Sequence, residues 1–297
     1  MTRVNAFRST CAVLSLLCLP AAVRPEQGPL EGAAKAPLDD DQKRLTAKQR
    51  ERRNRRLLER PSPDGKWLLL QQHDGFIVMP KDRSRTIKRK ISEKEFWATC
   101  SNVLWMPDSR QWVCLMAGKK SIYAVVLSRQ KKGILRKLPI GYPRGTITMW
   151  DLMGSRLLGF IKPNRVLALP LRDPPLNEGK PRKVPFYEFS TGEGKPQVRE
   201  FLITLPKEAQ EPREVALSPQ GNQLAWLLYL APSDEAKVNE VQLVVSRPDG
   251  TAMRVVGSFK IAGATSFYDL PRQLTWLPEG KRVSFVYKKV RWTVPLK

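Results

Sequence analysis

A short turn motif recurs along this chain of 297 residues and constrains its fold more than any other feature. Its clearest copy, PSPDGKWLLL, begins at Pro61. Proline fixes φ at the second turn position, Asp and Gly permit a tight reversal, and an apolar run follows. Aligned on the last turn position, the motif occurs at Gly65, Ser109, Gly154, Gly221 and Gly280. The residues predicted to form these turns are Pro63, Asp64, Gly65, Pro107, Asp108, Gly154, Pro219, Gly221, Pro278 and Gly280.

Each turn stands between runs of Val, Ile, Leu, Trp and Tyr that are typical of β-strands. Many of these runs are apolar at every position, so both faces of the resulting sheet need cover. A single small sheet cannot cover its own two faces, whereas several sheets arranged radially cover one another and leave only short edges. The first three copies are about 45 residues apart, which is typical of propeller blades. The sequence therefore predicts an all-β fold, a β-propeller of about five blades, with a sixth, degenerate blade between Phe186 and Leu205 as the alternative.

Three tryptophans add to the repeat, because Trp105, Trp150 and Trp276 each precede the aligned turn position by the same number of residues. The motif resembles the TolB-type, WD40-like (PD40) propeller repeat, which has the core W/F-S-P-D-G-K-x-L-A-F. The resemblance is carried by SPDGKWLLL (62–70), SPQGNQLAW (218–226) and LPEGKRVSF (277–285), and in part by MPDSRQWVC. LMGSRLLGF lacks the Pro-Asp pair. The resemblance covers residues 57–297, which we assign to a propeller domain, and it implies protein–protein contacts in the cell envelope.

Two further segments are predicted before the propeller. Residues 1–23 combine Arg3 and Arg8 with a short apolar run and small residues, the pattern of a cleaved signal peptide, with an uncleaved anchor as the alternative. Residues 24–56 are predicted to form a flexible spacer rich in Pro, Gly and Ala, followed by a short basic helix. That helix either lies on an anionic surface or is a solvated lead-in. The last blade lacks an outer strand, which we expect to come from around Arg53–Arg60.

The charge of the chain is strongly positive, with 52 Lys and Arg against 28 Asp and Glu and a net charge of +24. Such a charge favours anionic partners, although a basic surface can also serve solubility alone. A cleaved signal peptide predicts a periplasmic or secreted protein, free or associated with the membrane, and so disfavours nucleic acid. The expected partner is a protein of the envelope, the alternative is an anionic lipid or glycan surface, and the chain is expected to be a monomer.

Catalytic and metal-binding motifs are scarce in this sequence. His73 is the one histidine, and there is neither a Cys-x-x-Cys pair nor a G-x-S-x-G elbow. We therefore expect no metal, no cofactor and no nucleophilic catalysis. The acids nearest the predicted central channel are Glu214 and Asp269, the candidates if the chain is a divergent propeller glycosidase. The preferred interpretation is a non-catalytic module for protein binding or scaffolding.

Two cysteines, Cys100 and Cys114, remain outside the predicted signal peptide. One disulfide between them is arithmetically possible. The predicted hairpin, however, sets Val103 opposite Cys114 and places Cys100 out of register. Two separate thiols are therefore favoured over a bridge.

A partner-binding face is predicted where the connections between blades and those between second and third strands open together. The same end is expected to hold the turn KPNR (162–165). Aromatic residues interleaved with cations are typical of binding surfaces. The alternative is that the aromatics wedge between blades, and RQKKG (129–133) makes the opposite end basic as well. The predicted rim consists of Phe96, Trp97, Tyr142, Arg144, Phe267, Tyr268, Arg272, Lys119, Lys120, Lys288 and Lys289.

Overall fold

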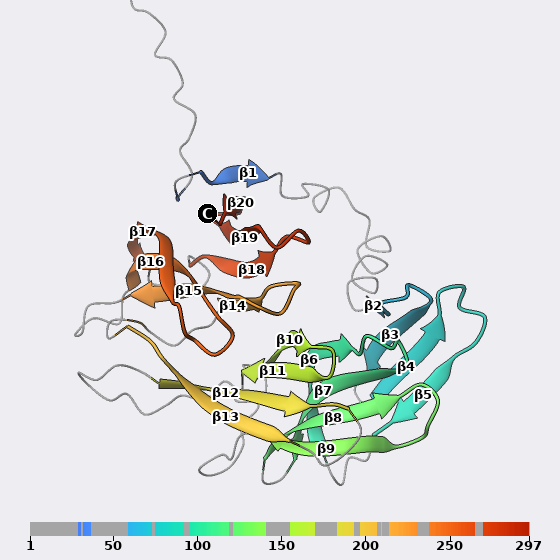
Figure 1. The fold of residues 1–297 in the computed structure, drawn as a ribbon. Coiled ribbons are helices and arrows are strands. Elements are labelled where there is room, and N and C mark those ends of the chain that lie inside the picture. Colours follow the sequence, from blue (N-terminus) through green and yellow to red (C-terminus); the bar gives the residue numbers. More distant parts are fainter. Residues whose placement is uncertain are drawn as a thin grey trace, which may run out of the picture.

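The chain forms strands throughout the part that the structure, a computed structural model, describes. That part comprises residues 29–30, 32–36, 59–72, 75–91, 96–118, 121–140, 155–169, 183–192, 197–206, 209, 214–230, 238–264 and 270–296. Twenty strands make five antiparallel sheets of four strands each (Figure 1). In these ranges there is no helix, and hence no helix that could cross a membrane.

Three of the five sheets come from the first two thirds of the chain. Sheet 1 consists of β2 (Glu59–Pro61), β3 (Trp67–Gln72), β4 (Gly75–Pro80) and β5 (Ile87–Lys90). Sheet 2 consists of β6 (Phe96–Trp105), β7 (Gln111–Gly118), β8 (Ile122–Ser128) and β9 (Ile134–Ile140). Sheet 3 consists of β10 (Arg156–Lys162), β11 (Arg165–Leu169), β12 (Lys183–Ser190) and β13 (Val198–Thr204).

The remaining two sheets complete the fold. Sheet 4 consists of β14 (Glu214–Leu217), β15 (Leu224–Leu230), β16 (Val238–Ser246) and β17 (Arg254–Ala264). Sheet 5 joins the two ends of the chain and consists of β18 (Arg272–Trp276), β19 (Arg282–Tyr287), β20 (Val290–Pro295) and β1 (Ala34–Ala36). In every sheet except sheet 5, the four strands follow one another in sequence order.

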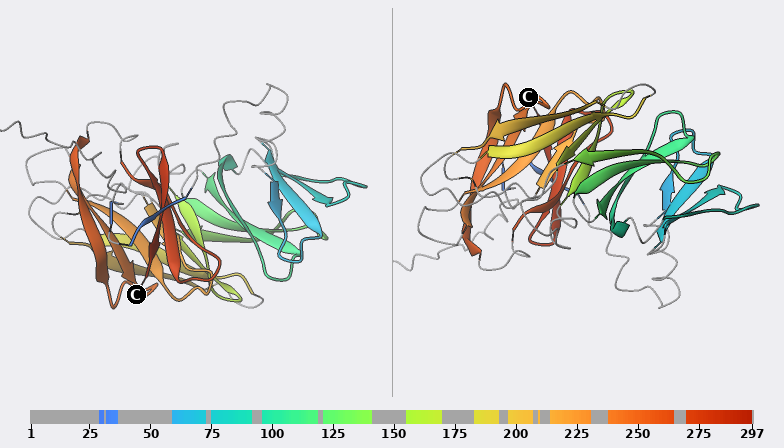
Figure 2. Two further views of the ribbon diagram at one scale, coloured as in Figure 1. Left: turned by 90° about the horizontal axis from the view of Figure 1, so that it is seen from above. Right: turned by 90° about the horizontal axis from the view of Figure 1, so that it is seen from below.

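Consecutive sheets pack face to face around an arc, with β6, β10, β14 and β18 next to one another on its inside (Figures 1 and 2). Strand β7 shows how the sequence produces this arrangement, because its successive side chains point to opposite faces. Trp112, Cys114 and Met116 belong to a cluster shared with sheet 1. The alternate residues belong to a cluster shared with sheet 3, and they are Val113, Leu115 and Ala117.

Among the described residues, four apolar clusters of this kind each join one sheet to the next, from sheet 1 through to sheet 5. Each fully buried aliphatic side chain in them stabilises the fold by about 2 kcal/mol. Among the described residues, no cluster joins sheet 5 to sheet 1. The prediction of an all-β propeller built from stacked, two-sided sheets is confirmed.

The outer strand of sheet 5 differs from the prediction. It comes from Ala34–Ala36, which pairs with β20, and not from the region of Arg53–Arg60. These three residues lie inside the segment predicted as a flexible spacer, so that part of the spacer is a strand. Nearby Leu30 is buried in the cluster between sheets 4 and 5. Small Ala side chains and a pairing edge on β20 suffice for a strand that has no apolar pattern of its own. The predicted signal peptide and basic helix lie outside the described residues.

Sheet 3 also corrects two predictions. Its innermost strand is β10, which follows Gly154 and lies against β6 and β14. The turn between the first and second strands is therefore KPNR (162–165), where Lys162 pairs with Arg165. Pro163 fixes φ in this turn as proline does in the motif, whereas Gly154 itself lies outside the described residues. The segment proposed as a sixth blade, Phe186–Leu205, supplies β12 and β13 of this same sheet.

Candidate ligand-binding groove

Four copies of the turn motif adopt one conformation. In each, the amide of the last turn residue donates to the carbonyl three residues earlier, at 2.8–3.0 Å. That last residue has a positive φ, which glycine tolerates best: 67° at Gly65, 71° at Gly221 and 69° at Gly280, against 55° at Ser109. All four turns join the first strand of a sheet to its second, so they lie at one end of the stacked sheets. We call this the turn end.

The recurrent tryptophans connect neighbouring sheets. Trp105 Nε1 donates to the carbonyl of Arg60 in sheet 1 at 2.8 Å. Trp276 Nε1 donates to the carbonyl of Ala216 in sheet 4 at 2.9 Å. Each indole thus reaches from the first strand of its own sheet to the first strand of the preceding one. Trp150 lies outside the described residues.

Glu214, one of the two candidate glycosidase acids, also connects two inner strands. Its carboxylate accepts the amide of Leu274 in β18 at 3.0 Å, and the residue is 8% exposed. Because it satisfies a buried amide, this carboxylate has a structural role. Asp269 and His73 lie outside the described residues.

The hairpin predicted around Cys114 is present in sheet 2. Val103 pairs with Cys114 in the register of β6 and β7, as predicted. Cys114 is fully buried, and its Sγ lies 3.8 Å from the carbonyl oxygen of Val125.

The predicted rim is only partly within the described residues. Phe96 and Trp97 begin strand β6 instead of lying in the connection before it. Arg272 begins β18 opposite Val286, and the exposed pair Lys288 and Lys289 forms the β19–β20 turn at the same end of sheet 5. The other six rim residues lie outside the described residues, and they are Lys119, Lys120, Tyr142, Arg144, Phe267 and Tyr268.

At the turn end, a groove of about 780 Å³ separates sheets 3 and 4. Apolar side chains from both sheets form its floor, and they are Ile161, Leu167, Phe201 and Val245. Its inner wall is the turn that holds Gly221, and its outer wall is the turn from Arg247 to Ala252. A volume of this size is typical of ligand-binding sites.

Two glycines allow the two turns that wall the groove to lie directly against sheet 3. At Gly221 there is no room for a Cβ, because the backbone of Phe160 and Ile161 occupies its place. At Gly250, φ is 81° and a Cβ would lie 2.7 Å from Cγ2 of Ile203. Sheet 4 therefore touches sheet 3 at an inner and an outer point, and the groove is the space left between them.

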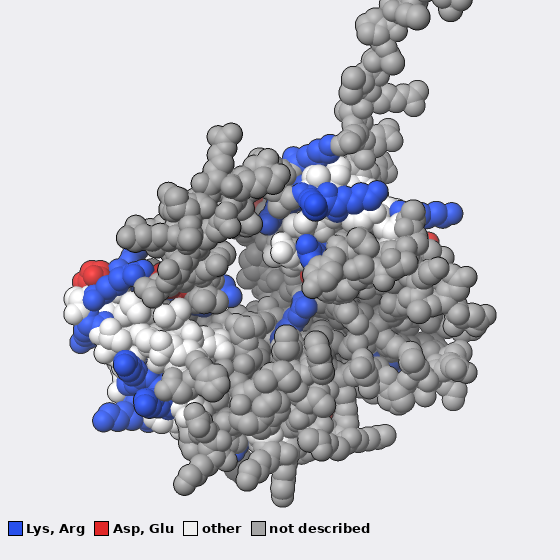
Figure 3. Space-filling model, turned by 180° about the vertical axis from the view of Figure 1, so that it is seen from behind, with Lys and Arg blue, Asp and Glu red and all other residues white. Residues whose placement is uncertain are grey.

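Cations outnumber acids around the groove. Four exposed basic side chains line it: Lys162, Arg199, Arg247 and Arg254. The lining acids are Glu188 and Asp249. Figure 3 shows that Lys and Arg are also spread over the described surface of one face of the molecule, where few acids are visible.

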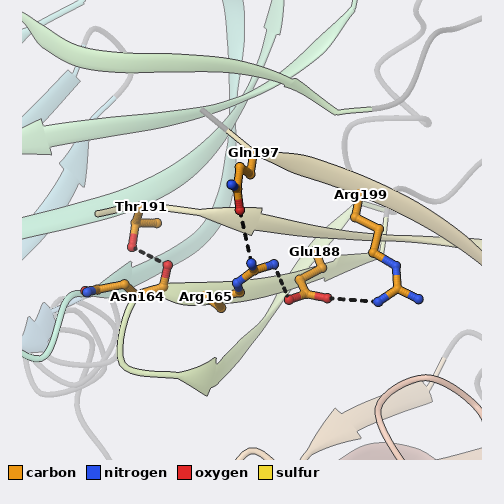
Figure 4. A network of polar contacts seen from close by, with 6 residues as sticks. All are labelled: Asn164, Arg165, Glu188, Thr191, Gln197 and Arg199. Carbon is orange, nitrogen blue, oxygen red and sulfur yellow. Dashed lines mark hydrogen bonds and ion pairs between the residues drawn. The ribbon is translucent and has the colours of Figure 1, made fainter. Parts of the chain in front are cut away.

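Both acids of the groove already have partners. Glu188 Oε1 accepts from Nη1 of Arg165 at 2.6 Å, and Arg199 lies 4.0 Å from its other oxygen (Figure 4). Arg165 also donates to Gln197 at 3.1 Å. Asp249 accepts from the hydroxyl of Thr251 at 2.6 Å and from its amide at 2.9 Å. The hydroxyl bond, followed by the amide bond, holds the pKa of Asp249 below its ordinary value of 3.8.

The groove offers cations and apolar surface for binding. In the part of the chain that the structure describes, no group of three or more His, Cys, Asp or Glu side chains is arranged to hold a metal ion. Sequence reasoning missed this groove, although a signal was present. The outer wall reads SRPDGTAMR (246–254), a further Pro-Asp-Gly turn that occurs between third and fourth strands.

Comparison with known proteins identifies no family. No family model and no curated protein matches the sequence. Among solved structures, similar chains include hydrazine synthase of Kuenenia stuttgartiensis, with a TM-score of 0.50, 15% identity, and coverage of 76% of this chain and 60% of that chain.

Two other similar structures have lower TM-scores. The Cps50 (Swd1) β-propeller domain of Myceliophteria thermophila has a TM-score of 0.47 and 12% identity over 79% of this chain and 64% of that chain. TolB of Acinetobacter baumannii has a TM-score of 0.43 and 11% identity over 80% of this chain and 54% of that chain. The chain thus spans less than two thirds of the length of these three proteins. At such low identity the similarity concerns the fold alone.

Proposed function

We propose that this chain is a non-catalytic propeller that binds a partner protein in the cell envelope. The observation that carries the proposal is the groove between sheets 3 and 4, which combines an apolar floor with four cations around it. Surfaces that bind other proteins use the same combination of apolar anchors and positively charged arginines. Glu214, by contrast, is occupied by the amide of Leu274, as a structural residue would be.

The envelope location rests on residues 1–23, whose pattern is that of a cleaved signal peptide. Determining the mature N-terminus by mass spectrometry tests this part of the proposal. A mature chain that begins near residue 24 supports export. A chain that keeps Met1–Val23 in a cytoplasmic fraction contradicts it.

The binding role is tested by affinity capture from an envelope extract of the host cell. The immobilised protein is compared with an Arg199→Gln/Arg247→Gln variant and with a rim variant in which Trp97, Tyr142 and Tyr268 are replaced by Ala. Specific recovery of a partner that one variant loses supports the proposal and identifies the face. Recovery of no specific protein by the unaltered chain contradicts it.

A second function, adhesion to anionic lipid or glycan, is favoured by the net charge of +24 and by its spread over the surface (Figure 3). Exposed charges more than about 10 Å apart are screened at 0.1 M salt, so binding by diffuse charge falls steeply as salt is raised. Co-sedimentation with anionic vesicles over a salt series tests this function. Binding that does not change between low and physiological salt excludes it.

A further inference from the structure

We infer that the groove between sheets 3 and 4 recognises an acidic peptide segment of the partner, in which carboxylates alternate with apolar side chains. The inference rests on the proposed function and specifies its site and ligand class. The site lies at the turn end, away from the predicted rim. Its residues come from six strands and two turns, and of these the turn at Gly221 is the part that the repeat motif identifies.

The shape of the groove is fixed before any ligand arrives. Close contacts of Gly221 and Gly250 with sheet 3 fix the position of sheet 4 on the two sides of the groove. Trp226 Nε1 donates to Ser246 Oγ at 3.0 Å, and that hydroxyl donates to the carbonyl of Arg247 at 2.9 Å. These bonds anchor the outer turn to a fully buried indole. A preorganised site loses little conformational entropy on binding.

The charge around the groove favours carboxylates. Lys162, Arg199, Arg247 and Arg254 line it, while Glu188 and Asp249 are the lining acids. Glu188 is held by Arg165 at 2.6 Å, with Arg199 at 4.0 Å from its other oxygen, and Asp249 is held by Thr251. Both acids therefore have partners within the walls of the groove. An incoming carboxylate therefore meets a net positive charge at the groove, where charge-assisted hydrogen bonds to Arg are strong.

The floor of the groove distinguishes a peptide from other anions. Phe201 stacks on Phe186 with centroids 5.8 Å apart. Phe201 and Ile161 are half-buried and offer apolar surface to a ligand, whereas Leu167 and Val245 of the lining are buried beneath the surface. Sugar acids and lipid headgroups offer no apolar side chain to such a floor. A peptide supplies carboxylates and aliphatic groups on one short segment, and an open groove between two turns admits a continuous chain.

The test uses the full mature chain and three fluorescein-labelled octapeptides, measured by fluorescence anisotropy at physiological salt. The first peptide alternates Glu pairs with Leu, the second replaces every Glu with Gln, and the third replaces every Leu with Ser. We expect the Glu/Leu peptide to bind at least about tenfold more tightly than either of the others, since both charge and apolar contact contribute.

A matched pair of variants locates the binding. Arg199→Gln/Arg247→Gln removes two charges from the groove, and Lys131→Gln/Lys132→Gln removes two exposed charges from the turn end of sheet 2. We expect the groove variant to weaken binding of the Glu/Leu peptide about tenfold or more, and the control variant to change it less than about twofold. Equal thermal stability of both variants establishes that the fold is retained.

Four outcomes overturn the inference. Equal loss in both variants assigns the binding to diffuse charge, and equal affinity for the Glu and Gln peptides excludes carboxylate recognition. Tighter binding of a heparin oligosaccharide or of phosphatidylglycerol vesicles through Arg199 and Arg247 assigns the groove to another class of ligand. If affinity capture recovers a partner that the groove variant retains, only this inference fails and the proposed function stands.

Discussion

Trp276 reaches across the boundary between two sheets and donates its indole N–H to the carbonyl oxygen of Ala216, 2.9 Å away. Trp105 makes the equivalent bond to Arg60 between sheets 2 and 1, at the other end of the arc. The tryptophan that precedes the turn motif is therefore a connection between blades, whereas the turn itself shapes a single blade. Stability of the stack is expected to depend on these bonds.

Replacing Trp276 with Phe tests this connection. The change keeps an aromatic ring but leaves the Ala216 carbonyl without its donor, so we expect the free energy of unfolding to fall by about 1 kcal/mol. Trp105→Phe removes the equivalent bond to Arg60 and is expected to cost a similar amount. Urea denaturation measures both. Unchanged stability in both variants contradicts the prediction.

Substitutions at Glu214 separate a structural carboxylate from a catalytic one. Glu214→Ala leaves the buried amide of Leu274 without an acceptor and is expected to cost about 2 kcal/mol of stability. Glu214→Gln keeps an oxygen acceptor and should cost clearly less. The two variants are compared by thermal and urea unfolding. If Gln and Ala destabilise equally, the bond to Leu274 is not the reason for this residue.

Alanine substitutions at Gly65 and Gly221 test the close contact between sheets 3 and 4, because the two glycines share a backbone conformation but have different surroundings. Gly65 and Gly221 have nearly the same φ, but a Cβ at Gly65 has nothing within 4 Å, while one at Gly221 meets the backbone of sheet 3. We expect Gly65→Ala to cost about 1 kcal/mol from left-handed strain. Gly221→Ala should cost about 3 kcal/mol, because overpacking adds to the strain. Equal unfolding midpoints for the two variants would disprove the close contact.

The acid dependence of stability is expected to involve Asp249. Its folded pKa is lowered, first by the hydroxyl of Thr251 and then by the amide of Thr251, so the charged carboxylate stabilises the turn above the unfolded value of about 3.8. That stabilisation is lost as the pH falls from there through the lower folded pKa. In melting experiments between about pH 5 and 2, Asp249→Asn should lose less stability than the unaltered protein. An NMR titration in which Thr251→Val does not raise the pKa of Asp249 would contradict this assignment.

Several features of the fold are readable in the sequence because they depend on local chemistry. The turn at Gly65 needs a positive φ, and the two-sided apolar pattern of β7 requires a sheet on each side. For sheet 3, the sequence predicts the turn between the first two strands at Gly154, whereas the structure has it at KPNR. The prediction is wrong because the motif copy at Gly154 lacks the Pro-Asp pair. Pro163 in KPNR stands midway in sequence between Pro107 and Pro219, and this spacing is the signal that marks the correct turn.

Other features depend on contacts between distant segments and have no local signal. Ala34–Ala36 becomes a strand only because β20 offers it an edge, and nothing in its own composition indicates pairing. The groove likewise requires Gly250 of sheet 4 to meet Ile203 of sheet 3. A motif search finds each turn, but it cannot find the space between two turns on different sheets.

The pairing of β1 with β20 has a consequence for maturation of the protein. Sheet 5 takes its fourth strand from residues that precede the other described strands, so this sheet cannot be completed until β20 has been synthesised. Removal of the chain up to or beyond Ala36 would take away the fourth strand of sheet 5. The cleavage proposed near Val23 would leave β1 in the mature chain, where it pairs with β20.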